Sequence, residues 1–168
     1  MKADRTAKQD GTAESVSLKA LRRPEELRRS LIQLQERHSV CWERCISLAR
    51  RDEGEHVSAS RNIRRQEDSF AEAAALEAEI QETREALSDA VNAAEKLLNR
   101  LEAAPDIHSY PNALVLRLRY LENLTWAEVC AALRRNGFPV TIRNVSSWRD
   151  AALKELDRIV EPPDVEKH

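Results

Sequence analysis

The residues best suited to chemistry lie near the C-terminal end of this 168-residue chain. Arginine can bind guanine through two hydrogen bonds, asparagine can bind adenine in the same way, and cations and hydroxyl groups bind phosphate oxygens. These side-chain types are concentrated in one short segment, which predicts an interface with double-stranded DNA. The candidate DNA-binding residues are Arg134, Arg135, Thr141, Arg143, Asn144, Ser146, Ser147 and Arg149.

The expected roles differ along this segment. Arg134, Arg135 and Thr141 are best placed for phosphates, because they precede or begin the last predicted helix. We expect Arg143 and Arg149 to share the exposed side of that helix, whose first turns can reach base edges in the major groove. An ordinary solvated surface is the alternative interpretation of both arginines.

A second group of reactive side chains, His38, Cys41 and Cys45, lies in the first half of the chain with the spacing H-x-x-C-x-x-x-C. Zinc ligands converge as a tetrahedron, usually with help from a turn, whereas these three residues follow one helical pattern. We therefore expect them to pack in a helix seam, with a metal site or redox use as alternatives. With Cys130 the chain has three cysteines, which favours free thiols in a reducing compartment.

No pattern of catalytic residues accompanies these groups. The sequence has no glycine-rich phosphate loop and no paired Ser, His and Asp set, so we predict a protein that is not an enzyme and needs no cofactor. The N-terminus lacks an apolar signal segment, and no apolar run is long enough to span a bilayer. We expect no membrane partner and a cytoplasmic location in a bacterial cell.

Composition predicts an all-α fold. Glycine occurs only 3 times, aromatic residues make up 4% and charged residues 33%, which suits long solvated helices. The net charge of −2 is unevenly distributed. Residues 63–103 hold ten acids and five bases, whereas residues 112–160 hold eight bases and five acids. Nucleic acid should therefore attract the C-terminal part and repel the acidic helix, whose acidic face is a solvated surface or a docking site for a basic partner.

Residues 24–103 are predicted to form a long antiparallel helical hairpin, a coiled-coil arm. Residues 1–23 lack periodicity and are expected to be a disordered tail, with Pro24 opening the first helix. Residues 52–61 form the loop. The second helix is longer than the first, so part of its seam should be left over for a dimer or a higher homo-oligomer. The expected seam residues are Leu76, Ile80, Leu87, Ala94, Leu97 and Leu101.

Residues 104–111 are predicted to be a linker and residues 112–161 a three-helix domain, with a tail at 162–168. The domain should contain helices at about 112–122, after Thr125, and from Thr141 to about 160. Thr125 and Glu128 match the T-x-x-E capping box that begins many helices. Two short helices, a connector with glycine and a longer helix with polar first residues form a helix-turn-helix pattern.

The strings RLRYLENLTWAEVCAAL and NVSSWRDAALKEL resemble the helix-turn-helix domain of sigma-70 region 4. They are closer still to the small phage and prophage regulators of the ArpU and RinA type, which place a charged helical region before a similar domain. The resemblance covers about residues 114–159 and implies promoter binding. One difference is the connector of residues 134–140, RRNGFPV, which is longer than the tight turn usual in the family.

These observations predict a phage-type transcriptional regulator that binds double-stranded DNA through its last helix. The arm would mediate homo-oligomerisation or contact RNA polymerase. Two alternatives remain: a small terminase-like subunit for DNA packaging, and an interaction adaptor that does not bind DNA. Packaging subunits usually place the DNA-binding domain first in the chain, which favours the regulator.

Overall fold

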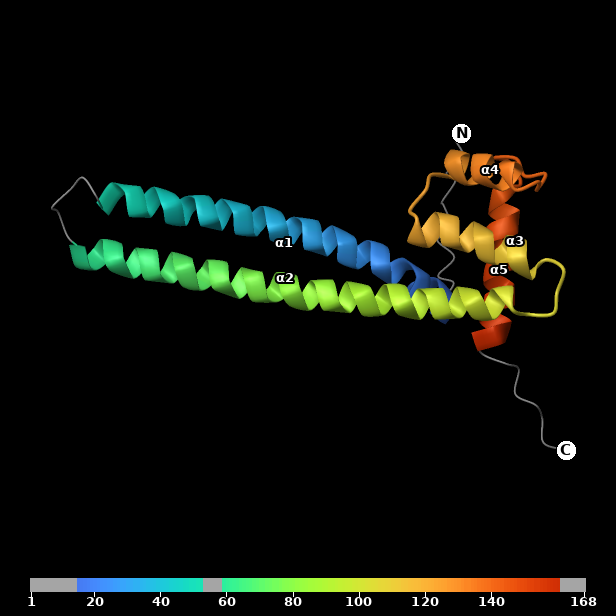
Figure 1. Cartoon of the computed structure of the whole chain (residues 1–168), viewed down its shortest axis with the longest axis horizontal. Helices are drawn as coiled ribbons and strands as arrows, with labels where there is room; N and C mark the ends of the chain where they lie inside the picture. Colours follow the sequence, from blue (N-terminus) through green and yellow to red (C-terminus); the bar gives the residue numbers. More distant parts are fainter. Residues whose placement is uncertain (1–14, 53–58, 161–168) are drawn as a thin grey trace, which may run out of the picture.

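The computed structural model describes residues 15–52 and 59–160, and these contain helices and turns but no strand. Two long antiparallel helices form an arm, and the remaining helices gather at one end of it (Figure 1). The prediction of an all-helical chain with two long packed helices is confirmed. The elements are α1 (Val16–Asp52), α2 (Ala59–Glu102), α3 (Ser109–Leu116), the π-helical segment η1 (Arg117–Leu121), α4 (Trp126–Arg135) and α5 (Val145–Val160).

Several predictions concern segments outside the described residues. These are the disordered tail over residues 1–14, the centre of the loop over 53–58, and the C-terminal tail from 161 onward. Within the ranges that the structure describes, no helix combines the length and hydropathy needed to cross a bilayer.

The first helix begins at Val16 and not at Pro24, so the prediction of a tail reaching residue 23 is wrong. Ser15 starts the helix, because its hydroxyl accepts a hydrogen bond from the Leu18 amide at 3.2 Å. Pro24 then lies inside α1, where it removes one backbone hydrogen bond. Burial offsets this cost, since Leu21 and Pro24 are both completely or almost completely buried.

The distal part of the arm is held by a narrow seam between α1 and α2. Leu34, Cys41 and Cys45 of α1 pack against three α2 residues, Ala73, Leu76 and Ile80. Cys41 also donates a hydrogen bond from its thiol to the Ser69 carbonyl, with a sulfur–oxygen distance of 3.5 Å. Burial raises the pKa of the Cys41 thiol, which favours the protonated, unreactive form.

The proximal part of the arm shares one hydrophobic core with the C-terminal helices, which we call the junction core. Its buried residues come from α1, α2, α3, η1 and α5, so the core crosses the predicted 104–111 linker. The arm and the C-terminal helices therefore share this core. The C-terminal helices also have a second core of their own, formed by Val115, Leu118, Val129, Cys130, Ala132, Leu133, Val140 and Val145. The junction core consists of Leu21, Ala94, Leu98, Leu101, Ala113, Leu116, Tyr120, Ala152 and Leu156.

The junction core leaves no surplus seam on α2 for a second copy of the chain. Ala94 and Leu101 are completely buried inside one molecule, and Leu76 and Ile80 face α1. Leu87 and Leu97 are half-buried. The first helix is shorter than α2, as predicted, with 37 residues against 44. The end of the α2 seam that it was expected to leave over packs against the C-terminal helices of the same molecule.

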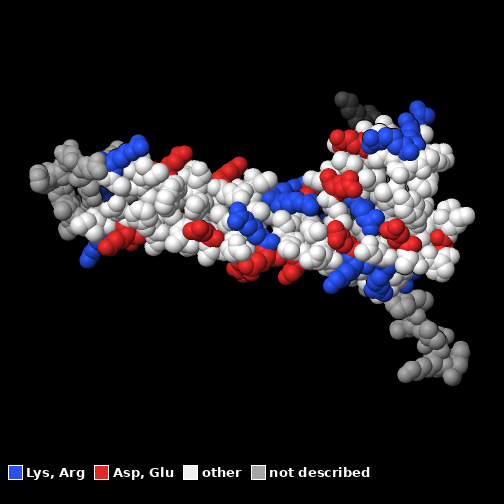
Figure 2. Space-filling model, viewed as in Figure 1, with Lys and Arg blue, Asp and Glu red and all other residues white. Residues whose placement is uncertain are grey.

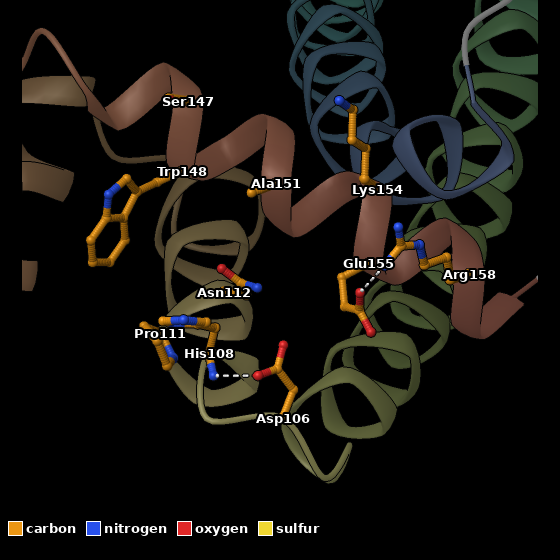
Figure 3. Close-up of a pocket in the computed structure, with 10 residues that line it drawn as sticks. All are labelled: Asp106, His108, Pro111, Asn112, Ser147, Trp148, Ala151, Lys154, Glu155 and Arg158. Carbon is orange, nitrogen blue, oxygen red and sulfur yellow. Dashed lines mark hydrogen bonds and ion pairs between the residues drawn. The ribbon is translucent and has the colours of Figure 1, made fainter.

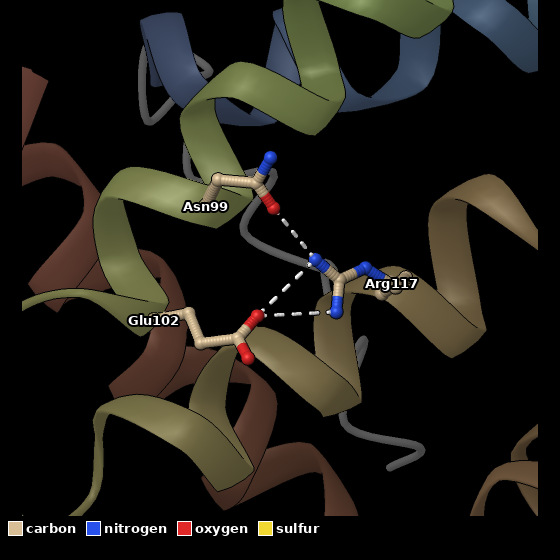
Figure 4. Close-up of polar contacts among 3 residues, drawn as sticks. All are labelled: Asn99, Glu102 and Arg117. Carbon is tan, nitrogen blue, oxygen red and sulfur yellow. Dashed lines mark hydrogen bonds and ion pairs between the residues drawn. The ribbon is translucent and has the colours of Figure 1, made fainter.

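Arginine side chains reinforce the junction from three directions. Arg117 of η1 contacts both Glu102, at 3.3 Å, and Asn99, at 3.0 Å, near the end of α2 (Figure 4). Arg28 donates to the carbonyl of Leu121, and Arg100 donates to that of Ile159. Both carbonyls lie in the last turns of their helices, where cations also interact favourably with the helix dipole. The arm thus fixes the orientation of η1 and α5.

The α4 helix begins as the sequence predicts. Glu128 accepts a hydrogen bond from the Thr125 amide at 2.8 Å, and the Thr125 hydroxyl accepts one from the Glu128 amide at 3.4 Å. This reciprocal pair is a complete capping box. The hydrogen bonds from Thr125 hold the pKa of Glu128 below its ordinary value of 4.5, because they stabilise the carboxylate.

The Glu128 cap predicts an acid-sensitive contribution to stability. A lowered pKa in the folded state means that the contribution is present above pH 4.5 and is lost as the pH falls through the folded-state pKa. Glutamine can make the same hydrogen bonds without titrating, so Glu128→Gln should be less stable than wild type at neutral pH. The difference should shrink in acid. Urea unfolding of both proteins across this pH range measures it, and a constant difference would contradict the assignment.

Candidate nucleic-acid interface

The connector between α4 and α5 is ordered by local hydrogen bonds. Gly137 adopts a left-handed conformation with φ of 84°, and the next amide, of Phe138, donates back to the Leu133 carbonyl at 3.1 Å. This pattern is typical of a helix that ends at glycine. Arg134 then donates from Nε to the Val140 carbonyl at 2.7 Å. The arginine predicted to bind phosphate therefore also fixes the path of the connector.

A second cap precedes α5. The Asn144 side-chain oxygen accepts hydrogen bonds from the Thr141 amide at 2.6 Å and the Thr141 hydroxyl at 3.0 Å. The Asn144 amide approaches the same hydroxyl at 3.4 Å. Thr141 thus begins the final helical segment, as predicted, although regular α-helix starts at Val145. The Asn144 oxygen is engaged inside the molecule, which counts against the two-bond contact to adenine that the sequence suggests.

The exposed face of the final helical segment, which we call the outer face, carries Arg143, Ser146, Ser147, Asp150 and Lys154. All five residues are exposed, whereas Val145, Ala152 and Leu156 on the opposite side are buried. Arg143 forms no ion pair with any residue that the structure describes. The outer face can therefore meet a ligand as large as a DNA groove without unfolding the helix.

Arg149 does not share this face, and the prediction that it does is wrong. Six positions separate it from Arg143, about one and two-thirds helical turns, so the two side chains diverge. Arg149 is paired with Asp150 at 2.6 Å, and its guanidinium carbon lies 5.8 Å from the centre of the Trp126 ring. Its side chain is 34% exposed and belongs to the surface between α5, η1 and α1.

Ile142 is apolar but 64% exposed, because the turn at residues 142–144 is not regular helix. Trp148 is half-buried and contacts Phe138 edge to face, with ring centres 6.2 Å apart. Trp148 therefore supports the connector, as expected of a core aromatic residue.

A cleft of about 500 Å³ runs along one edge of the outer face, between α5 and the start of α3. Ser147, Trp148 and Lys154 line its α5 side, and His108 and Asn112 line the other (Figure 3). Acids and bases both occur there, including an Arg158–Glu155 pair at 3.3 Å. The cleft borders the outer face on one side, and Ser147 lies at the rim of the cleft.

Charge is concentrated at two places near the C-terminal helices. In the view of Figure 2, Lys and Arg gather over the α4 end and over the lower end of α5, with acids between them. Arg134 and Arg135 end α4 and are exposed, and Arg135 has no ion pair among the described residues. The Arg134 hydrogen bond to the Val140 carbonyl ties the end of α4 to the start of the final segment, and we call Arg134, Arg135 and Arg143 the basic edge.

Sequence reasoning missed Lys154, which lies on the outer face about two and a half turns after α5 begins. It also missed Asp150 as an exposed acid in the same face. Helical spacing from Ser147 and Arg143 identifies both, because positions three or four apart share a face. The basic side chain of Arg22, which lines a pocket with Arg119, could not be found in this way, because α1 begins earlier than expected.

The described residues contain no group of three or more His, Cys, Asp or Glu side chains arranged to hold a metal ion. Cys41, Cys45 and Cys130 are all buried free thiols. No protein-family model matches the chain, and comparison with curated proteins and with solved structures gives no significant match.

Proposed function

We propose that this chain is a sequence-specific regulator of transcription that binds double-stranded DNA. The observation that carries the proposal is the outer face, where Arg143 is exposed in the turn before α5 and Ser146 and Ser147 are exposed in its first turn. A helix of this kind fits the major groove, and its first turns reach base edges. The resemblance of residues 114–159 to sigma-70 region 4 and to phage regulators of the ArpU and RinA type supports the same function.

The basic side chains around the outer face would bind phosphates and so position α5 in the groove, without contacting base edges. Arg134 and Arg135 can contact phosphates on one side of the groove, and Lys154 can do so further along α5. Asn144 and Thr141 support this arrangement by fixing the first turn. The arm would hold the C-terminal helices in place and offer a surface for a second copy or for RNA polymerase, in the cytoplasm of a bacterial cell.

A second candidate function is a protein-interaction adaptor without affinity for DNA. Asp150 favours it, because an exposed acid in the centre of the outer face repels phosphate. Asp150 forms an ion pair with Arg149 at 2.6 Å, which reduces this repulsion. We therefore prefer the DNA-binding function.

Selection of bound DNA from random duplexes and genomic fragments tests the proposal. A regulator should enrich a short shared sequence. Enrichment without a shared sequence would favour a packaging subunit, and no enrichment at low salt would favour the adaptor. An Arg143→Ala chain serves as the control, because it should lose the shared sequence while keeping its fold.

A further inference from the structure

A cavity of about 350 Å³ lies where the proximal part of the arm meets the C-terminal helices (Figure 1). We call it the arginine pocket, because four arginines and two glutamates line it, which gives its wall a net charge of +2. The arginines come from α1, η1 and α5, and they are Arg22, Arg29, Arg119 and Arg149. Both glutamates are paired within α1, Glu25 with Arg29 and Glu26 with Arg23. The pocket therefore favours an anion.

Two of these arginines are held in place beside the Trp126 ring, which also lines the pocket. The guanidinium carbons of Arg119 and Arg149 lie 5.1 and 5.8 Å from the ring centre. Arg119 also donates from Nη1 to the Leu124 carbonyl at 2.8 Å, and Arg149 donates to Asp150. These contacts occupy only some of the five N–H donors of each guanidinium. Both arginines can bind an anion without first being ordered, which lowers the entropic cost of binding.

The Tyr120 hydroxyl opens into the same pocket. Tyr120 is only 7% exposed, and its hydroxyl has no hydrogen-bond partner among the described residues. The partnerless side-chain oxygens that are sealed from solvent in this part of the chain belong to Ser17 and Ser109. The Tyr120 oxygen is not sealed in this way, so the pocket that Tyr120 lines gives access to it. A hydroxyl group this deep in a protein ordinarily has a hydrogen-bond partner, and a bound ligand can supply one.

The cations of the pocket surround this hydroxyl. Burial raises the pKa of Tyr120, whereas the guanidinium groups of Arg149, Arg22 and Arg119 act on it in the opposite direction. Asp150 acts with burial, and it is itself paired with Arg149. An anion that enters the pocket would thus meet a neutral O–H donor and several positive charges at one point.

We propose that the arginine pocket binds a small phosphorylated molecule, whose phosphate group accepts hydrogen bonds from Arg119, Arg149 and the Tyr120 hydroxyl. A phosphate group carries up to two negative charges and several acceptor oxygens, which match planar guanidinium donors. A volume of about 350 Å³ is at the lower end of the range for small-molecule sites, and it leaves room for more than the phosphate group.

The DNA backbone is the other possible source of a phosphate group, and the pocket fits it less well. Glu25 and Glu26 line the same cavity, so the successive phosphates of a continuous strand would meet acids as well as arginines. The Tyr120 hydroxyl is also recessed, and only a group that enters the cavity can contact it. The proposal does not rest on DNA binding by the outer face, which lies on a different side of α5 from Arg149.

Nuclear magnetic resonance of the isotope-labelled full chain tests the site with inorganic pyrophosphate as the probe. The three tryptophans give three indole N–H signals. At constant ionic strength, pyrophosphate should shift the Trp126 signal and saturate it in the millimolar range. The Trp42 signal, from the distal part of the arm, should not move. An unchanged Trp126 signal, or equal and unsaturated shifts of both signals, would overturn the proposal.

Tyr120→Phe tests the predicted contact, because it removes the hydroxyl and leaves the ring in the junction core. Pyrophosphate affinity should fall at least about ten-fold, since hydrogen bonds to charged groups are among the stronger ones. Tyr110→Phe is the matched control. It removes the same atom from a tyrosine that is 46% exposed beside Phe138, outside the pocket. Equal pyrophosphate affinities in the two variants would contradict the assignment of Tyr120.

A duplex titration of the same two variants separates the two sources of phosphate. If the pocket serves a small molecule, Tyr120→Phe and Tyr110→Phe should bind duplex DNA alike. Loss of duplex affinity in Tyr120→Phe, with no binding of pyrophosphate by wild type, would assign the pocket to the DNA backbone and overturn the proposal. A chain that binds pyrophosphate but no duplex would contradict the DNA-binding function and leave the arginine pocket supported.

Discussion

Replacing Leu98 with alanine is expected to destabilise the whole protein by about 2–5 kcal/mol, the range for large cavities in a packed core. Leu98 is completely buried in the junction core, where α1, α2, α3, η1 and α5 meet. Because this core belongs to the arm and to the C-terminal helices together, both should unfold in one transition. Circular dichroism reports mainly on the arm, and Trp126 and Trp148 fluorescence in a Trp42→Phe background reports on the C-terminal helices.

Leu97→Ala is the matched control for this prediction. It removes the same atoms from the neighbouring residue, which is half-buried, so it should cost clearly less, about 1–2 kcal/mol. Equal losses in the two variants would mean that the junction core is not centred on Leu98. Two separate transitions would show that the C-terminal helices form a domain of their own, as the sequence pattern suggests.

Replacing Arg143 with alanine is expected to weaken binding to the selected DNA by about 1–3 kcal/mol, roughly five- to 150-fold. The reason is that Arg143 is exposed on the outer face and has no ion-pair partner among the described residues. Thermal unfolding should be nearly unchanged, since exposed side chains contribute little to stability. Fluorescence anisotropy with a labelled duplex measures the affinity.

Arg149→Ala supplies the contrast, because Arg149 is held by Asp150 and Trp126 on a different side of α5. Its loss should change DNA affinity much less than the loss of Arg143, although it leaves Asp150 unpaired and so weakens binding slightly. A larger effect at Arg149 than at Arg143 would mean that DNA approaches the surface between α5 and α1, and that the outer face is not the interface.

The helices and their caps were predictable where the controlling interactions are local. The Thr125–Glu128 capping box and the start of the final segment at Thr141 depend on residues three positions apart, so the sequence pattern contains all the information. The two long helices were predictable for a similar reason, because their apolar residues repeat with helical spacing.

The structure differs from the sequence-based predictions where contacts between residues far apart in the chain determine the local structure. A proline ordinarily starts a helix, but Leu21 is buried against α2 and α5, and this packing extends α1 beyond Pro24. The heptad pattern predicts Leu97 as the buried residue, but in the structure Leu98 is completely buried and Leu97 only partly. The reason is that helices pack against the end of α2 from two sides. Neither choice is visible in a single helical pattern.

The candidate site shows the same division. Arg143, Ser146 and Ser147 are exposed as the helical pattern suggests. Asn144 and Arg149 are residue types that bind DNA, but both already have partners within the fold. The Asn144 side chain accepts a hydrogen bond from Thr141, and Arg149 forms an ion pair with Asp150. Residue type alone cannot show which polar group already has a partner within the fold.

Titration of the wild-type chain with a duplex of the selected sequence, at several salt concentrations, tests the proposed function most directly. Binding through the outer face and the basic edge predicts an affinity that falls linearly on a log–log plot of the affinity constant against salt. Each lost phosphate contact, as in an Arg135→Ala chain, should reduce that slope by about 1. Absence of duplex binding at the lowest salt would contradict DNA recognition by this protein.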